Sequence, residues 1–196
     1  LDKLPRKIET YDISNISGEF MVAAMCVMQD GIIKKNISRR FKIKTVLGQV
    51  DPRCMAEVIE RRLLHSIKNE NDIGFGKLPD LIFCDGGITQ IRAIKAAMSD
   101  VGVEIPVFGM VKDDKHTTRA LIDESRKEFK ISPKLMNLIT LFQDTVHDTA
   151  ISYHRKLRDK GMIESELDNI EGIGKIKKQL LKDKLISAQP IIILLL

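Results

Sequence analysis

The sequence predicts an α/β protein whose mixed sheet is flanked by helices. Its N-terminal quarter contains strand-like runs separated by turn signals, whereas the rest alternates short apolar runs with segments of helical apolar spacing. Short turns join antiparallel strands and helical connections join parallel ones, so both kinds of pairing are expected. Hydrophobic residues at 43% and charged residues at 30% are ordinary for a globular protein, which excludes collagen, a coiled coil and intrinsic disorder as the dominant state.

Five apolar runs have the character of β-strands. In the third, Phe41 and Ile43 alternate with lysines, the pattern of a strand with one buried face. The last two lack alternation, as expected for strands that are covered on both faces. The five strands are expected at residues 7–13, 20–28, 37–44, 81–84 and 106–111.

Three segments have the apolar spacing of helices. The first begins at Asp51, a good N-cap followed by proline, and runs to about residue 65. The second follows a glycine pair, and the third comes after a charged loop and extends from Ser132-Pro133 to about Arg158. Three strands followed by helix, strand, helix, strand and helix resemble the ribonuclease H-like layout.

Charge and cysteine content limit the compartment and the partners. A net charge of +5 permits an anionic partner such as nucleic acid without proving one. Three scattered cysteines favour the reducing cytoplasm over a disulfide framework. The apolar run at residues 191–196 is far too short to span a bilayer, so no membrane association is expected. A start at Leu1 rather than methionine suggests a piece of a longer polypeptide, and we expect this fragment to be a monomer.

A change of composition near residue 160 predicts a domain boundary. We expect an α/β domain at residues 1–160 and a partial helix-hairpin-helix at residues 161–184. In the second segment, Gly172 and Gly174 form a Gly-x-Gly hairpin followed by Lys175, whose backbone N–H groups could hold a phosphate. Residues 185–196 are expected to be an atypical or truncated tail.

Two aspartates stand where strands end. Asp12 comes late in the first strand, and Asp85 directly follows the buried fourth strand and precedes a glycine pair. If these strands are parallel neighbours, both carboxylates emerge at the edge of the sheet where α/β folds place ligands. Oxygen ligands of this kind suit Mg²⁺ or Mn²⁺. The alternative is that both are ordinary turn acids, and the spacing alone leaves both interpretations open.

His147 on the last helix is the third candidate. It shares a helix face with His154, but seven residues place the two rings about 10 Å apart, too far to chelate one ion together. Because the cysteines also lack paired spacing, a zinc site is disfavoured. A partly buried polar role for His147 remains an alternative. Asp51 is explained by helix capping, so a metal role there would be additional.

Basic residues surround these candidates and could contact phosphates, although each cluster alone could be a solvated face. The residues expected to bind DNA are Arg39, Arg40, Lys112, Lys115, Arg119, Arg155, Lys156, Gly172, Gly174 and Lys175.

Several motifs occur together in one order. They are Tyr11-Asp12-Ile13-Ser14, Arg39-Arg40-Phe41, Arg61-Arg62, Leu78-Pro79-Asp80-Leu81-Ile82, Asp85-Gly86-Gly87, Lys112-Asp113-Asp114-Lys115-His116-Thr117, and His147 with His154-Arg155-Lys156. Over roughly residues 6–184 they resemble the C-terminal half of the UvrC family, the incision subunits of bacterial nucleotide excision repair.

The resemblance implies a ribonuclease H-like endonuclease that cuts damaged duplex DNA on the 5′ side of a lesion, in a complex with a UvrB-type subunit. It implies Asp12, Asp85 and His147 as catalytic residues and ligands of Mg²⁺ or Mn²⁺, and Asp51 as a further catalytic acid. At the Asp51 motif the family usually has two acids before an aromatic residue, whereas Val50 and Pro52 flank Asp51 here. The competing functions are a DNA-binding module that does not cut, and a ribonuclease acting on RNA–DNA hybrids.

Overall fold

The computed structural model describes residues 3–15, 21–45, 51–72, 74–113 and 118–168, together with 174, 176–177 and 179–181. The chain divides into two compact units, residues 1–154 and 155–196. The sheet and the candidate site lie in the first unit. Within the described residues, no helix is long and apolar enough to cross a membrane.

The sheet is mixed, as the sequence predicts. β1 is antiparallel to β2 and parallel to β5, and β6 is parallel to β5 and antiparallel to β7. The described strands follow the order β3-β2-β1-β5-β6-β7-β8, and β4 also pairs with β2. Their bounds are β1 (Lys7–Asn15), β2 (Met21–Gln29), β3 (Ile32–Ile33), β4 (Arg39–Lys42), β5 (Leu81–Asp85), β6 (Val107–Lys112), β7 (Thr118–Ile122) and β8 (Glu128–Phe129), with a short 3₁₀ helix η1 (Lys35–Ile37) before β4.

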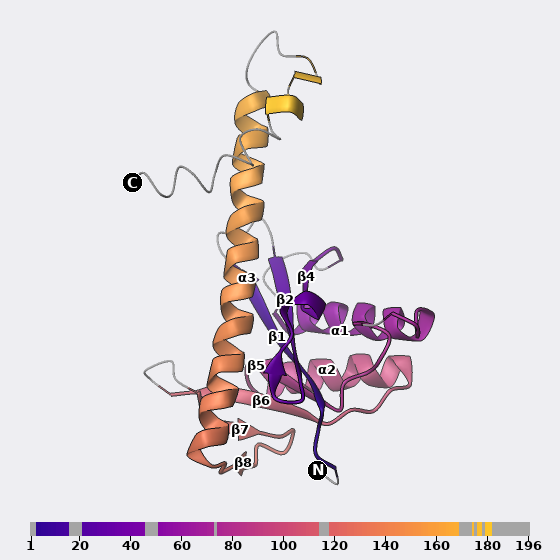
Figure 1. Ribbon diagram of the computed structural model, residues 1–196, viewed down its shortest axis with the longest axis vertical. Helices are drawn as coiled ribbons and strands as arrows, with labels where there is room; N and C mark the ends of the chain where they lie inside the picture. The colour runs from indigo at the N-terminus through magenta and orange to yellow at the C-terminus, as the bar shows by residue number, and fades with distance from the viewer. Residues whose placement is uncertain are drawn as a thin grey trace. The chain divides into compact units, whose positions relative to one another are not determined.

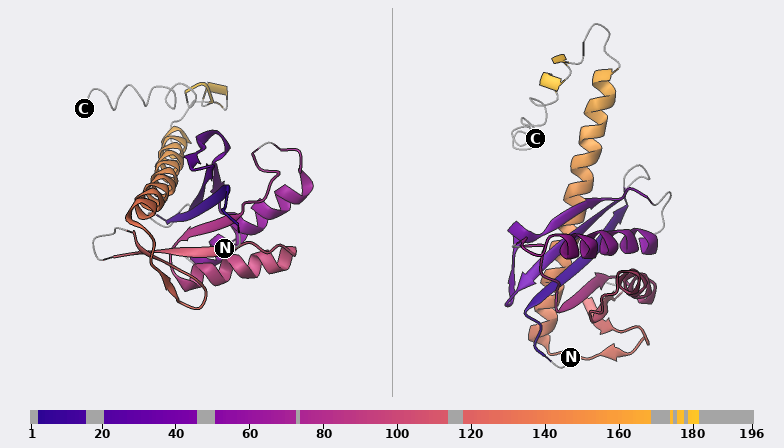
Figure 2. Two further views of the ribbon diagram at one scale, coloured as in Figure 1. Left: turned by 60° about the horizontal axis from the view of Figure 1, so that its bottom comes forward. Right: turned by 90° about the vertical axis from the view of Figure 1, so that its right-hand side faces the viewer.

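Helices cover both faces of the sheet. α1 (Asp51–Lys68) and α2 (Ile88–Val101) lie side by side on one face, and the first part of α3 (Pro133–Asp168) covers the other (Figure 1). The two further views show the same arrangement, with the sheet between the α1–α2 pair and α3 (Figure 2). The first unit is therefore a three-layer α/β domain.

Each face of the sheet has its own apolar core. Residues such as Tyr11 and Met55 form the core between the sheet and the α1–α2 pair. Phe83, Phe142 and Val146 belong to the core between the sheet and α3. Successive side chains of a strand point to opposite faces. The alternation along β1 therefore places Tyr11 in the first core and turns its neighbour Asp12 toward α3.

The structure corrects several sequence-based boundaries. The expected charged loop between residues 111 and 132 contains β7 and β8, because Ala120, Leu121 and Ile122 are buried on the sheet. The expected strand at 37–44 is divided between η1 and β4. α1 extends to Lys68, and Asp51 lies in its first turn rather than at the cap, since the helix begins there.

The end of the last helix was also predicted wrongly. α3 continues past Arg158 to Asp168, through Gly161 and without an interrupting proline. The helix-hairpin-helix expected at 161–184 stays a prediction: residues 161–168 belong to α3, and Gly172 and Lys175 lie outside the described residues. The tail at 185–196 also lies outside them.

Candidate metal centre

Three residues that the sequence separates widely meet on the α3 face of the sheet. Tyr11 of β1 pairs in parallel register with Cys84 of β5, so Asp12 and Asp85 follow on adjacent strands. α3 brings His147 over them, and one potential ligand atom from each of the three residues lies within 4.8 Å of the others. The structure therefore assembles the three residues that the sequence motifs single out as ligands.

The surroundings of Asp12 disfavour the charged form of its carboxylate. Burial, together with the like charge of Asp85, raises its pKa from 3.8 to about 6, although the bond to His147 acts in the opposite direction. The Asp12 side chain is 9% exposed, and His147 Nδ1 lies 2.9 Å from its Oδ2. Because an ionised carboxylate only accepts, Nδ1 donates in this bond and Nε2 remains available for other chemistry.

Asp85 is held from two sides. Gln143 Nε2 of α3 donates to its Oδ1 at 2.7 Å, and Lys112 Nζ of β6 donates to its Oδ2 at 2.8 Å. Gln143 Oε1 in turn accepts a hydrogen bond from the hydroxyl of Thr118 on β7. Sequence reasoning missed Gln143 and Thr118, and it assigned Lys112 to DNA rather than to this centre.

Gln143 could have been recognised from the sequence. Gln143 lies one turn before His147, among the buried positions Phe142 and Val146 of α3. A polar side chain at such a position needs a partner, which points to the site. Thr118 carried no comparable signal, because the surrounding stretch was expected to be a loop.

Two glycines shape the turn after Asp85. Gly86 has φ of 146°, a conformation that residues with a Cβ rarely adopt. On the neighbouring strand β6, a Cβ at Gly109 would lie 2.4 Å from the Gly86 carbonyl oxygen. The close approach of β6 therefore depends on glycine at position 109. Gly87 differs, since a Cβ there would meet nothing within 4 Å.

The other predicted residues lie apart from this cluster or outside the described chain. Asp51 is exposed and is not part of the three-residue group found among the described residues. Arg119 is paired with Glu128 at 2.6 Å. Arg155, Lys156 and Gly174 are exposed and belong to the second unit, and Lys115, Gly172 and Lys175 lie outside the described residues.

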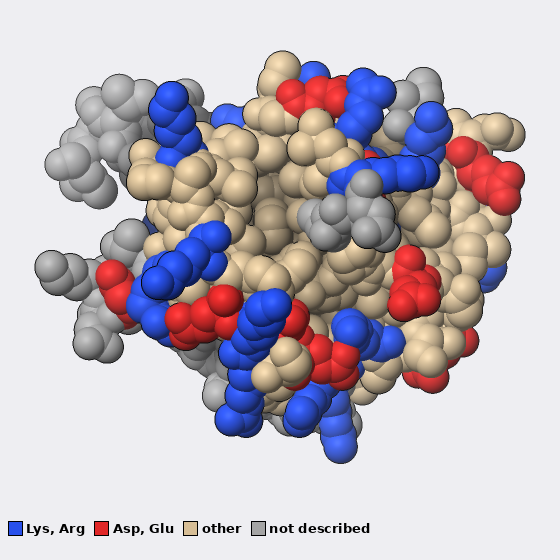
Figure 3. All heavy atoms as spheres, turned by 90° about the horizontal axis from the view of Figure 1, so that it is seen from below, with Lys and Arg blue, Asp and Glu red and all other residues tan. Residues whose placement is uncertain are grey.

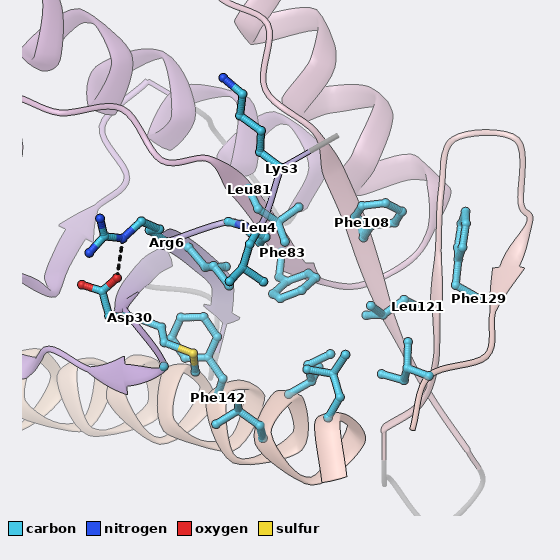
Figure 4. Close-up of a pocket in the computed structure, with 18 residues that line it drawn as sticks. Lys3, Leu4, Arg6, Asp30, Leu81, Phe83, Phe108, Leu121, Phe129 and Phe142 are labelled. Atoms are coloured by element: carbon cyan, nitrogen blue, oxygen red, sulfur yellow. Dashed lines mark hydrogen bonds and ion pairs between the residues drawn. The ribbon is translucent and has the colours of Figure 1, made fainter. Parts of the chain in front are cut away.

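A hollow of about 860 Å³ lies away from the carboxylates. It is open on the face in Figure 3, where uncharged residues form its floor and charged side chains stand around it. Phe83, Phe108 and Phe142 line it, and the Arg6–Asp30 ion pair lies at its edge (Figure 4). Asp12 and Asp85 do not line this apolar hollow, so it is separate from the candidate metal centre.

The three residues fit a divalent cation. Mg²⁺ binds oxygen at roughly 2.0–2.1 Å, so all ligand atoms of one ion lie within about 4.2 Å of each other. The three ligand atoms lie within 4.8 Å of one another, so the side chains would have to move closer together to share one ion. Carboxylates suit hard divalent cations and an imidazole binds several divalent metals, so the three side chains fit a divalent cation rather than a thiolate-bound metal.

The fold and this site define the class as an endonuclease domain of the ribonuclease H-like type. Residues 1–151 match the family model described as the UvrC RNAse H endonuclease domain. The chain belongs to the UvrC family.

The relatives include UvrABC system protein C of Clostridium tetani, 45% identical over 92% of this chain, and that of Acetivibrio thermocellus, 43% identical over 93% of it. The chain spans about 31% and 32% of their respective lengths. Among solved structures, a Ciona intestinalis endonuclease V in complex with an inosine-containing DNA matches with a TM-score of 0.40 and 13% identity, over 59% of this chain and 51% of that one.

Proposed function

We propose that this chain is a Mg²⁺- or Mn²⁺-dependent endonuclease domain that makes the 5′ incision in damaged duplex DNA during nucleotide excision repair. The observation that carries the proposal is the convergence of Asp12, Asp85 and His147 within 4.8 Å. Two carboxylates at this distance repel each other, and a bound cation relieves that repulsion. Membership of the UvrC family supplies the reaction class.

The chain's own groups would divide the work of phosphodiester hydrolysis. Asp12 and Asp85 would hold the cation, which when bound activates water and stabilises charge on the phosphate. His147 is 47% exposed, so its ring can reach substrate and move a proton at Nε2. Its bond to Asp12 orients the ring. Lys112 supplies a positive charge beside the carboxylates.

The DNA backbone would run along a groove next to this centre. A hollow of about 670 Å³ is lined by Lys35, Arg39 and Arg40, by hydroxyl groups of α3 and by one acid, Asp148. Arg40 pairs with Ala24, which pairs with Asp12, so the three share one face of the sheet. Adjacent strands are about 4.8 Å apart, which places Arg40 two strands from Asp12. The further proposed contacts are Lys112, Lys115, Arg119, Arg155, Lys156, Gly172, Gly174 and Lys175.

The partners follow from the same assignment. We propose that the longer protein acts on damaged duplex DNA with a UvrB-type subunit, in the cytoplasm, because the relatives are components of the UvrABC system. Asp51, which is not part of the three-residue cluster, is proposed as a further catalytic acid. The three cysteines are free and buried, which suits a reducing compartment.

Nicking of supercoiled plasmid with Mn²⁺, with and without EDTA, tests the proposed function. Asp85→Asn keeps the size of the side chain but removes the charge that attracts the cation, so nicking should fall by about a hundredfold or more. Asp100→Asn is the matched control, since Asp100 is an exposed acid on α2, and it should nick as the parent does.

If the chain alone does not nick, the same variants are compared in a reconstituted repair complex. Nicking by Asp85→Asn at the rate of the parent would replace the nuclease assignment with a DNA-binding module. Preference for an RNA–DNA hybrid over duplex DNA would favour a ribonuclease instead.

A further inference from the structure

The two oxygens of Asp85 are held by groups of opposite character. Oδ1 accepts from Gln143, a neutral side chain that is 1% exposed. Oδ2 accepts from Lys112, a cation whose side chain is 29% exposed. A buried amide in a hydrogen-bonded network has little freedom to move, whereas a lysine on a flexible stem can change partner at low cost.

Thr118 holds the oxygen end of the Gln143 amide, while the carboxylate of Asp85, which only accepts, selects the orientation of that amide. The Thr118 hydroxyl donates to Oε1, which leaves Nε2 directed at Asp85. The reversed amide would direct Oε1 at the carboxylate, and two acceptors would then face each other. Gln143 therefore acts as a fixed donor to Oδ1 of Asp85.

An irregularity in the sheet brings Thr118 to this position. Along β7, Leu121 pairs with Met110 and faces the α3 core. Regular alternation from Leu121 would turn Thr118 to the opposite face. The register shift between Val111 and Lys112 instead pairs Thr118 with Lys112, next to Gln143. Bulges of this kind commonly redirect a side chain beside a functional site.

Lys112 lies where a cation is needed. Its ammonium group compensates the negative charge of Asp85, and it also favours the ionised form of Asp12. A divalent cation that binds both carboxylates must therefore replace an attraction that Lys112 already supplies. Gln143 presents no such competition, since it is uncharged and bonds the other oxygen.

We propose that Gln143 and Thr118 are positioning residues that hold Asp85 as a metal ligand, and that Lys112 is an exchangeable counter-ion that occupies the place of the divalent cation until the cation binds. The inference rests on the proposed function of the site. Once displaced, the ammonium group is free to contact a substrate phosphate beside the cation.

The proposal predicts changes of opposite sign in metal affinity. Lys112→Met removes the competing charge, and because a neighbouring opposite charge shifts carboxylate equilibria by 1–3 pKa units, Mn²⁺ should bind about tenfold more tightly or better. Lys112→Arg keeps the charge and should leave the affinity near that of the parent. Gln143→Leu removes the support of a ligand, which should weaken Mn²⁺ binding by roughly 10–100-fold.

Calorimetric titration of the 196-residue chain with Mn²⁺ measures these affinities without any activity assay. Thr118→Val should weaken binding in the same direction as Gln143→Leu, and Thr118→Ser should restore it. Lys95→Met is the matched control for charge, because Lys95 pairs with Glu124 on the surface of α2, and it should bind Mn²⁺ as the parent does.

Two further readouts distinguish a counter-ion from a structural ion pair. In EDTA, Lys112→Met should lower the melting temperature, because both carboxylates lose their compensation, and Mn²⁺ should then raise it more than in the parent. At saturating Mn²⁺, Lys112→Met should nick DNA more slowly than the parent despite its tighter metal binding.

Unchanged or weaker Mn²⁺ binding by folded Lys112→Met would overturn the counter-ion role. Parental affinity in Gln143→Leu would overturn the positioning role. Failure of the proposed function has a different signature: the parent would bind no Mn²⁺, or Asp85→Asn would bind it equally well, and both proposals would then fall together.

Discussion

The two faces of β1 each bury a carboxylate, and the surroundings treat the two differently. On the α1–α2 face, Glu9 is fully buried and receives bonds from Arg62 Nη2 at 2.7 Å and from the Tyr11 hydroxyl at 2.6 Å. Arg62 also donates to the carbonyl groups of Phe75 and Lys77. The charge of Glu9 is thus compensated by the protein itself.

On the α3 face, three residues further along the strand, Asp12 is in the opposite situation. Its neighbours are the like-charged Asp85 and the half-exposed ring of His147, with Lys112 beyond Asp85. Its raised pKa shows that the protein disfavours the charged form of this carboxylate. The comparison teaches that burial of a charge is not itself a functional signal: Glu9 has its charge partner within the fold, whereas Asp12 keeps a demand for positive charge that Lys112 and His147 meet only in part.

Breaking the compensated pair should have the largest effect on stability. Arg62→Met leaves Glu9 as a buried, poorly compensated charge and deprives the Phe75 carbonyl group of its donor, which should cost about 3–5 kcal/mol. Urea denaturation measures this loss. Arg61→Met is the neighbouring control, with an expected cost below about 1 kcal/mol because its pair with Glu57 lies nearer the surface. Equal costs for the two variants would show that the buried compensation of Glu9 contributes no more than a pair nearer the surface.

The α3 face, where the charge of Asp12 is only partly compensated, should produce a pH dependence of stability. The pKa of Asp12 is 3.8 as a model group and about 6 in the folded chain. Between these values the unfolded chain has released the proton that the folded chain retains, so the free energy of unfolding should fall as pH rises from about 4 to about 6 and then level off. The loss amounts to about 3 kcal/mol at ~1.4 kcal/mol per unit.

Urea denaturation in EDTA across this pH range, for the parent and for Asp12→Asn, checks the pH dependence. The variant should lack this component, because asparagine does not titrate. Identical pH profiles would show that Asp12 is not the group responsible. Mn²⁺ should reverse the trend above pH 6, since it binds the ionised carboxylates.

The smallest change in the free energy of unfolding is expected for a substitution of His154. It allows a comparison with His147, which lies on the same helix. His154 is 1% exposed, and neither of its ring nitrogens has a hydrogen-bond partner within the described part of the chain. His154→Leu should therefore change the free energy of unfolding by at most about 1 kcal/mol, in the stabilising direction, and should preserve nicking. His147→Leu should suppress nicking. A loss of several kcal/mol on His154→Leu, measured by thermal unfolding, would reveal a partner for this ring.

The mixed sheet and the placement of Asp12 and Asp85 could be predicted because they follow from local rules. An acid at the end of an apolar run, a glycine pair after it and a helical connection between parallel strands together bring two carboxylates to one edge. His147 could be placed on a helix by spacing, and the family motifs singled it out.

The surroundings of Asp85 could not be predicted in the same way. Thr118 reaches Gln143 only through a register shift in β7, in a stretch whose charged residues resemble a loop. Lys112, by contrast, follows Met110 by two residues on β6 and so shares its face of the sheet, but periodicity alone does not show that its ammonium group reaches Asp85. The contact of Thr118 with Gln143 depends on where β7 departs from regular alternation, and the periodicity of the sequence does not reveal that position.

The close approach of Gly109 to Gly86 has a consequence for how this protein tolerates sequence change. Alanine at position 109 would add a single methyl group to a strand that supplies no metal ligand, yet that carbon would overlap the Gly86 carbonyl oxygen at 2.4 Å. The backbone just after Asp85 would have to move, and the carboxylate would move with it. In a mutational scan, position 109 should therefore be as intolerant as the ligands themselves, although glycine there has no side chain with which to take part in the chemistry.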